Sequence, residues 1–160
     1  MPKHLLLVDS TMITVGKTRL PWAVYHVERL GIKLHVSFSS ETQMPLKVVE
    51  STGLTHDGPM GEQLADSRFI LVEDRAYYKI QRIDRFLEEG QDFVIRIIEN
   101  VELSSKRSLQ RLSQKDSNVT QDITCLLGSI QSRSKKQHRV VFFKDDDGRE
   151  IRVVRLSRKV

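Results

Sequence analysis

Residues 5–11, Leu-Leu-Leu-Val-Asp-Ser-Thr, and residues 69–74, Phe-Ile-Leu-Val-Glu-Asp, decide the predicted fold. Each is a short apolar run that ends on an acidic residue, Asp9 in the first and Asp74 in the second. Such a run without polar alternation is typical of a strand buried on both faces. Sites in α/β sheets form at the C-terminal ends of strands. If these two strands are parallel neighbours, the two carboxylates converge although 65 positions separate them.

The segments around these strands predict the order β-β-β-α-β-α-β. Residues 32–38 alternate apolar and polar side chains, which is typical of a half-buried strand. Residues 11–15 could continue the first strand, and residues 21–29 fit a loop or a short helix. Further strands are expected over residues 46–51 and 92–98, and helices over residues 60–65 and 79–89. The first strands follow one another too closely for crossover helices, so we expect them to be antiparallel.

The composition changes near residue 100. Residues 1–100 carry 12 basic and 14 acidic side chains, whereas residues 101–160 carry 14 basic and 7 acidic ones, for a total of +5. The Asp147–Gly148 pair lies between two β-rich runs and predicts a hairpin. We therefore expect an α/β core over residues 1–100 and a basic β-rich segment over residues 101–160. The basic segment indicates a polyanion partner, or alternatively a solvated basic surface.

Several classes of protein are excluded by composition. The chain has 160 residues, of which 39% are hydrophobic and 29% charged, as in an ordinary globular protein. No apolar run approaches the roughly 20 residues that a membrane span needs, so no membrane partner is expected. Cys125 is the only cysteine, which excludes an internal disulfide and a cysteine-rich zinc site. We expect it to be a core thiol.

Paired carboxylates are hard oxygen ligands that suit Mg²⁺ or Mn²⁺. Two such ions about 4 Å apart can hold both oxygens of an in-line phosphoryl displacement. Asp9 and Asp74 could form such a pair. The alternative is that Asp9 only forms a turn and that Asp74 only pairs with Arg75 at the surface.

The order of motifs resembles the catalytic core of bacterial insertion-sequence DDE transposases, of the insertion-sequence-four type. The resemblance is carried by LLLVDST (residues 5–11), GIKLHVSFS (31–39), THDGP (55–59) and FILVEDRAYY (69–78), followed by FVIR (93–96). It spans residues 4–100 closely and the rest loosely. It implies an RNase H-like mixed sheet of three antiparallel strands and then parallel strands with helices, together with a β-rich insertion.

The resemblance implies roles for individual residues. Asp9 and Asp74 match the family's first two catalytic aspartates, which are metal ligands for Mg²⁺ or Mn²⁺ in a two-metal site. Ala76 stands where many relatives have glycine. In the complete enzyme, an activated water would attack the phosphodiester at the element's end, and the freed 3′-hydroxyl would then attack target DNA.

The family's third carboxylate, a glutamate in the pattern Tyr-x-x-Arg-x-x-x-Glu, has no counterpart here. Glu99, Glu102 and Glu150 lie outside any such pattern. We therefore expect a transposase fragment, truncated at both ends, that lacks the family's N-terminal DNA-binding region and its final glutamate helix. Metal affinity should then be reduced, so whether this chain is an enzyme on its own stays open.

Basic residues are candidates for contacts with DNA phosphate. The set predicted to bind DNA is Lys33, His35, Arg75, Arg133, Lys135, Lys136 and Arg139. The alternatives are a solvent-facing strand for the first two and a flexible basic loop for the residues after 130. Asp57 could support the site or cap the following helix. Tyr77 and Tyr78 could stack on bases, or cover the next helix.

Three functions remain open from the sequence. The first is a fragment of a DNA transposase that acts on element ends and target DNA. The second is a non-catalytic remnant that binds DNA or pairs with itself or with a full-length transposase. The third is an RNase H-like nuclease with a different third ligand. Each places the protein in the cytoplasm, associated with the nucleoid.

Overall fold

The computed structural model describes residues 2–16, 24–26, 29–109 and 117–155. The chain forms two compact units, Met1–Tyr77 and Tyr78–Val160, and each is described by itself. The α2 helix and strand β6, which composition assigns to the core, belong to the second unit. The boundary near residue 100 stays a prediction about composition.

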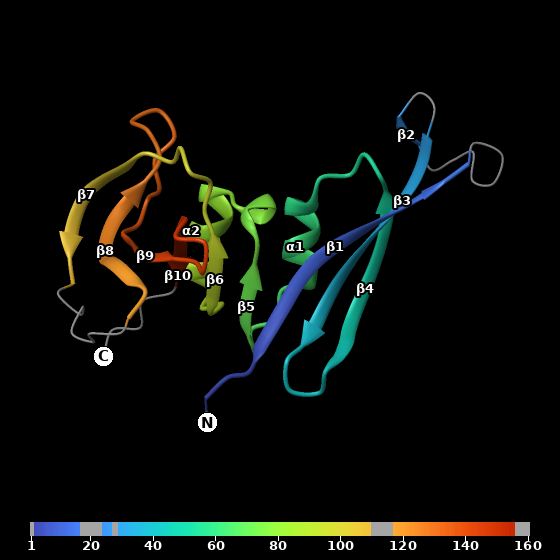
Figure 1. Ribbon diagram of the computed structural model, residues 1–160, viewed down its shortest axis with the longest axis horizontal. Helices are drawn as coiled ribbons and strands as arrows, with labels where there is room; N and C mark the ends of the chain where they lie inside the picture. The colour runs from blue at the N-terminus through green and yellow to red at the C-terminus, as the bar shows by residue number, and fades with distance from the viewer. Residues whose placement is uncertain (1, 17–23, 27–28, 110–116, 156–160) are drawn as a thin grey trace. The chain divides into compact units, whose positions relative to one another are not determined.

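The first unit contains a mixed sheet, in which β3 lies between β1 and β4 and β5 pairs with the other edge of β1 (Figure 1). Its strands are β1 (Leu5–Val15), β2 (Val24–His26), β3 (Arg29–Ser39), β4 (Met44–Thr52) and β5 (Ile70–Glu73). The β1–β3, β2–β3 and β3–β4 pairs are antiparallel, whereas β1 and β5 are parallel. The predicted antiparallel start is therefore confirmed.

Strand β1 is continuous through the aspartate that was expected to end it. Its residues from Leu6 to Val15 pair with β3 without a break, so residues 11–15 extend the same strand. Residues 24–26 form β2, which pairs with the start of β3, so the alternative of a short helix is wrong there. The rest of residues 17–28 lies outside the described part of the chain.

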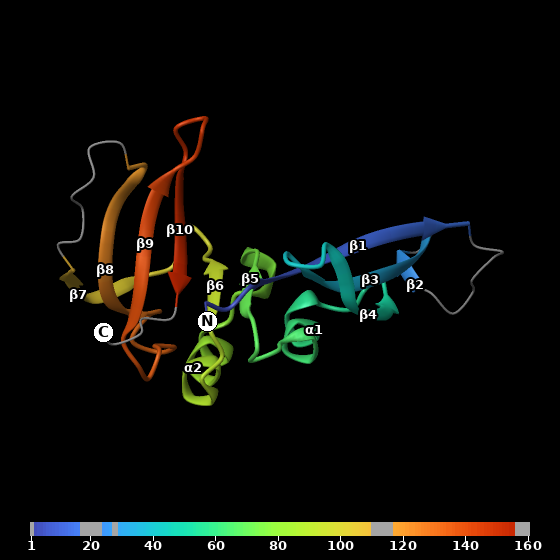
Figure 2. The ribbon, with the colours of Figure 1, turned by 90° about the horizontal axis from the view of Figure 1, so that it is seen from below.

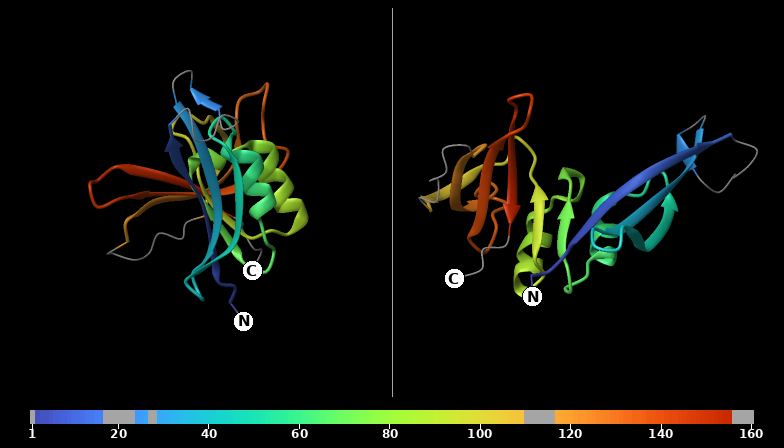
Figure 3. Two further views of the ribbon diagram at one scale, coloured as in Figure 1. Left: turned by 90° about the vertical axis from the view of Figure 1, so that its right-hand side faces the viewer. Right: turned by 60° about the horizontal axis from the view of Figure 1, so that its bottom comes forward.

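Helix α1 (Asp57–Leu64) covers one face of this sheet, as Figure 3 shows. Leu6 and Val8 of β1 are 1% and 4% exposed on that face, and Met60 and Leu64 are the buried apolar side chains of the helix. The side chains of a strand alternate between faces. Leu5 and Leu7 accordingly point the other way and are 41% and 40% exposed.

The predicted burial of β1 on both faces is therefore wrong. The described residues cover the face that carries Leu5 and Leu7 only in part, whereas Leu6 and Val8 on the face under α1 are buried. The same open face holds large apolar side chains on β4, among them Val48, which is 53% exposed. An exposed apolar surface of this kind is typical of a docking surface.

The second unit contains an antiparallel sheet in the order β6-β10-β9-β8-β7, together with helix α2 (Ile80–Glu89). Its strands are β6 (Phe93–Arg96), β7 (Leu103–Ser108), β8 (Val119–Leu127), β9 (His138–Lys144) and β10 (Glu150–Arg155). The predicted hairpin joins β9 to β10. There Gly148 has a φ of 76°, and the Asp145 carboxylate accepts the backbone N–H groups of Asp147 and Arg149.

Local signals explain where α2 ends and what it packs against. Gly90 adopts the left-handed conformation at the end of the helix, and its N–H donates to the Phe86 carbonyl. The centroids of the Phe86 and Phe93 rings lie 5.9 Å apart. Cys125 is fully buried, and burial raises its pKa to about 11, so it is a protonated core thiol, as predicted. Among the described residues, no helix is long and apolar enough to cross a membrane.

Gly61 lets α1 approach the end of β5 closely. A Cβ atom there would lie 2.7 Å from both Glu73 Oε1 and Tyr77 Cδ1. We expect Gly61→Ala to destabilise the protein by about 1–3 kcal/mol, because overpacking outweighs the helix propensity that alanine adds. Gly16→Ala is the control, since its Cβ would meet no atom within 4 Å, and should change stability by less than about 0.5 kcal/mol. Equal urea midpoints for the two variants would contradict this packing.

Two buried histidines should make stability depend on pH. Burial lowers the pKa of His35 and of His138 below the ordinary value of 6.5. The unfolded chain therefore takes up protons first as the pH falls through 6.5, so stability is retained above that pH and lost below it. Urea unfolding at pH 7.5 and pH 5.5 should show this loss. His35→Gln with His138→Gln should be less stable at pH 7.5 but vary less with pH. If the double variant keeps the full pH dependence, titratable groups other than these two histidines cause the loss of stability.

Candidate metal centre

The two predicted catalytic aspartates lie at neighbouring positions of the sheet. The parallel register pairs Leu5 with Ile70 and Val8 with Glu73, the residues that come directly before Asp9 and Asp74. Asp9 lies within β1, and Asp74 follows the last residue of β5. Neighbouring strands are about 4.8 Å apart. The pairing agrees with the side-by-side, parallel strands on which the expected convergence depends, and a joint role of the two carboxylates stays a prediction.

Asp9 lies on the open face of the sheet. Asp9 alternates with Leu6 and Val8, so it shares a face with the exposed Leu5 and Leu7. Asp9 and Asp74 are themselves exposed. Asp9 Oδ1 accepts the backbone N–H of Ser10 at 2.8 Å, which helps to hold this carboxylate.

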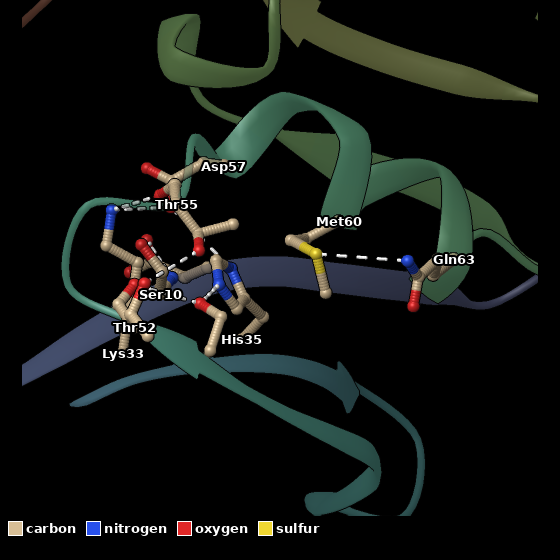
Figure 4. A network of polar contacts seen from close by, with 10 residues as sticks. Ser10, Lys33, His35, Thr52, Thr55, Asp57, Met60 and Gln63 are labelled. Carbon is tan, nitrogen blue, oxygen red and sulfur yellow. Dashed lines mark hydrogen bonds and ion pairs between the residues drawn. The ribbon is translucent and has the colours of Figure 1, made fainter. Parts of the chain in front are cut away.

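Beneath the aspartates, on the side covered by α1, lies a polar cluster of Lys33, His35 and Asp57 (Figure 4). The ammonium of Lys33 is 3.2 Å from Asp57 Oδ1 and also donates to the Thr55 carbonyl. His35 Nδ1 is 3.6 Å from the same Asp57 oxygen, and His35 Nε2 is 2.7 Å from Ser51 Oγ. The cluster thus joins the start of α1 to β3 and β4.

Asp57 does not occupy the helix-capping position that was one of its two predicted roles. It is the first residue of α1, and the N-cap position belongs to His56, whose side chain makes no capping hydrogen bond. The Asp57 carboxylate instead faces Lys33 and His35. An acidic group in the first turn still interacts favourably with the helix dipole.

Tyr77 and Glu73 are two further buried polar residues of the first unit. They are 1% and 4% exposed. Burial raises the pKa of Tyr77 far above its ordinary value, and the carboxylates of Asp57, Asp9 and Glu73 add to that rise. The phenol is therefore protonated and lies among the carboxylates behind the exposed pair. Tyr77 packs against Gly61 of α1, the helix that precedes it, whereas the packing alternative named the helix that follows.

The donor set fits part of a divalent metal site. Asp9 and Asp74 offer adjacent, exposed carboxylate oxygens, which are the ligand type that Mg²⁺ and Mn²⁺ prefer. Within the described ranges, no group of three or more histidine, cysteine or acidic side chains is arranged to hold a metal ion. These residues would therefore supply two protein ligands of a coordination shell.

The basic residues predicted near the first unit's site fall into two groups. His35 is fully buried and Lys33 has a side chain that is only 15% exposed, because both face Asp57 beneath the sheet. This orientation differs from the expected one toward a phosphate. Arg75 is exposed in the short 3₁₀ helix η1 (Arg75–Tyr77), directly after Asp74. Its contact with DNA stays a prediction.

The remaining predicted DNA contacts lie in the second unit. Arg133, Lys135 and Lys136 are exposed in the segment between β8 and β9. Arg139 donates from Nε to Asp122 Oδ1 at 2.8 Å, and its side chain is 12% exposed. The Arg139 guanidinium is thus already paired with Asp122. A role in DNA binding stays a prediction for all four residues.

Sequence reasoning missed two features of this region. Glu73 lies in the same strand as the buried Leu71 and alternates with Val72, so alternation puts Glu73 and Leu71 on one face, and this signal was present in the sequence. The pairing of Asp84 with His138 spans 54 positions and carries no spacing signal. It connects α2 to the start of β9.

Comparison with known proteins identifies the family of the chain. Residues 1–159 match the family model described as "Transposase DDE domain". Over 153 residues the chain is 61% identical to a protein of Geobacillus stearothermophilus described as "Probable transposase for insertion sequence element IS5377". The match covers 96% of this chain and 41% of that relative, so the chain spans less than half the relative's length.

A solved structure shows the same fold. The cryo-EM structure of the piggyBac transposase synaptic complex with hairpin DNA matches all of this chain and 34% of its own chain, with a TM-score of 0.58 and 17% identity. This likeness supports the RNase H-like α/β fold predicted from the sequence. Together with the match over residues 1–159, it leads to one conclusion: the chain belongs to the transposases with a DDE domain.

Proposed function

We propose that this chain provides the first two carboxylate ligands of a transposase that cleaves and joins DNA with divalent metal. The observation that carries the proposal is the parallel register of β1 and β5, which pairs Val8 with Glu73, the residues before the exposed Asp9 and Asp74. The family match supports the reaction class. The chain covers 41% of its relative's length, so the activity of the whole protein is part of the proposal.

The residues have separate tasks in this proposal. Asp9 and Asp74 bind Mg²⁺ or Mn²⁺, and Arg75 holds a phosphate oxygen beside them. When bound, the ions supply the positive charge that activates a water nucleophile and stabilises the leaving oxygen. Beneath the sheet, Glu73 and Tyr77 hold the backbone on either side of Asp74 in place. Such support behind a ligand is what keeps a metal site in its productive geometry.

The proposal also needs a third ligand, since no group of three or more histidine, cysteine or acidic side chains is arranged to hold a metal ion within the described ranges. The open face beside Asp9 is apolar at Leu5 and Leu7, so it can bury an apolar segment that brings a further carboxylate to the pair. This supports the assignment to a three-carboxylate site. A non-catalytic remnant that binds DNA, or an RNase H-like nuclease with another third ligand, is the alternative that the experiments below distinguish.

The proposed partners follow from the reaction. Element ends and target DNA are the substrates, and a second copy or a full-length transposase is the protein partner. The relative's printed description, a probable transposase for an insertion sequence, supports this choice. A DNA substrate implies a cytoplasmic protein associated with the nucleoid.

Metal binding tests the assignment of the two aspartates. We expect Mn²⁺ to bind the protein saturably and to raise its melting temperature, since a ligand at 100 times its Kd stabilises by about 2.7 kcal/mol. In Asp9→Asn with Asp74→Asn, the Mn²⁺-dependent rise should disappear. Without metal the double variant should be at least as stable as the wild type, because the repulsion between the two carboxylates is removed.

The control for this experiment is Asp146→Asn with Asp147→Asn, which removes the same charge from an exposed turn of the second unit. It should keep the full Mn²⁺ response. A double variant of Asp9 and Asp74 that still responds as the wild type does would exclude this metal site. Loss of the response in both double variants would indicate general attraction of cations to acidic surfaces.

Cleavage of DNA separates the catalytic proposal from the non-catalytic one. With Mg²⁺ or Mn²⁺ and supercoiled plasmid, a third ligand within this chain would give nicking that is abolished by Asp9→Asn. With only two ligands, we expect the chain alone to bind plasmid without nicking it. Adding the remaining portion of the transposase as a separate polypeptide should then restore nicking that depends on Asp9. No restoration, despite binding of the two polypeptides, would favour the non-catalytic remnant.

A further inference from the structure

The loop between β8 and β9, residues 128–137, is folded back on the end of β8 by a buried serine. Ser134 is 4% exposed. Its hydroxyl accepts the N–H of Leu127 at 2.9 Å and donates to the carbonyl of Lys136 at 2.9 Å, while its own N–H donates to the Leu127 carbonyl at 2.7 Å. The serine thus replaces the backbone partners that a regular strand would have supplied.

An aspartate from α2 fixes the same loop from the other side. Asp84 is 7% exposed, and its Oδ2 accepts the backbone N–H of Lys135 at 2.9 Å. Its Oδ1 lies 2.7 Å from Nε2 of His138, which is 2% exposed. Burial lowers the pKa of His138, so at neutral pH the uncharged ring donates from Nε2 to the carboxylate. Figure 2 shows the loop beside α2.

The turn that begins the loop requires a glycine at position 128. Gly128 has a φ of 94°, and a Cβ atom there would lie 2.0 Å from the Ser132 carbonyl oxygen. Its N–H donates to the carbonyl of Glu102 at 2.8 Å. Only glycine fits this position. The interpretation of the segment as a flexible basic loop is therefore wrong, since buried groups hold both its ends and its middle.

The exposed side chains of this loop include three that are positively charged. Arg133, Lys135 and Lys136 are exposed. In the described part of the chain, no ion pair joins Arg133 or Lys135 to an acidic side chain, and the Lys136 ammonium is 3.9 Å from Glu88. The Asp84 carboxylate is turned inward, where it binds the backbone and His138. The buried acidic group orders the loop, and the exposed surface of the loop is positive.

We propose that residues 128–137 form a preorganised loop that binds the phosphate backbone of DNA, and that Asp84 and Ser134 are its positioning residues. This inference rests on the proposed function in DNA transposition and deepens it. A preordered loop binds more tightly because less freedom is lost on association. The contacts are with phosphate, so they position DNA without reading its sequence.

Asp84→Asn distinguishes a positioning role of Asp84 from a purely electrostatic one, because the two predict opposite changes in DNA affinity. The substitution removes a negative charge close to the cations, so simple electrostatics predicts tighter DNA binding. Positioning predicts weaker binding, because the amide cannot accept from both Lys135 and His138. We expect a 3- to 10-fold weaker Kd, of the size of one missing buried hydrogen bond, measured by fluorescence anisotropy with a 20-base-pair duplex. Trypsin should also cut after Lys135 and Lys136 faster.

Glu88→Gln is the matched control, because it removes the same charge beside Lys136 without touching the loop backbone. It should bind DNA as tightly as the wild type, or more tightly. Ser134→Ala keeps the charge unchanged and should also bind more weakly, so it tests positioning even if Asp84→Asn fails to fold. Replacing Arg133, Lys135 and Lys136 by glutamine should lower the slope of log K against log salt by about 0.9 for each phosphate that the loop no longer neutralises.

The inference is overturned if Asp84→Asn and Ser134→Ala bind DNA like the wild type, or if the triple glutamine variant keeps the wild-type affinity and salt slope. Binding of the wild type to vesicles of anionic phospholipid but not to the duplex would overturn it too. The Mn²⁺ response separates it from the proposed function. That response depends on Asp9 and Asp74 and should be unchanged in every loop variant. Its absence in the wild type would contradict the proposed metal centre, while the loop measurements still decide this inference.

Discussion

The parallel pairing of β1 with β5 is the constraint on which the candidate site depends. Because Leu5 pairs with Ile70, the register reaches Val8 and Glu73, the residues that precede Asp9 and Asp74. A slip of one residue would turn one carboxylate toward α1. Leu6 and Leu71, which are 1% and 0% exposed, oppose such a slip because it would expose them. The apolar packing under α1 therefore determines the geometry of the polar edge.

Polar groups are buried where an apolar core would be simpler. Glu73, Tyr77 and His35 are each less than 5% exposed. Burying such groups costs free energy unless their partners are well placed. Here they connect the first turn of α1 to β3, and the turn after Asp74 to the rest of the sheet. Breaks in an otherwise regular pattern are expected at functional sites. The second unit repeats the arrangement with Asp84, which orders a cationic loop from beneath.

The sequence predicts the element order and the Asp147–Gly148 hairpin, because each rests on local periodicity or on a short turn signal. The convergence of Asp9 with Asp74 is conditional on parallel pairing of their strands, which the structure has. The sequence could not predict that Leu5 and Leu7 are exposed, since an apolar run does not say which face lacks a cover. It also predicted that His35 contacts DNA phosphate, with a solvent-facing strand as the alternative, because alternation gives two faces without saying which one α1 covers. The Asp84–His138 and Arg139–Asp122 pairs depend on tertiary folding over 54 and 17 positions. No spacing rule reaches that far.

The most direct measurement shows where the metal ion binds, rather than how it changes the stability of the protein. In ¹⁵N-labelled protein, small additions of Mn²⁺ broaden the amide signals of residues next to the bound ion. The proposed centre predicts that the amides of Ser10 and Arg75 broaden first, and that Asp9→Asn with Asp74→Asn abolishes this. Broadening that begins around Asp145–Asp147, with Ser10 and Arg75 unchanged, would contradict a metal site at the paired strands.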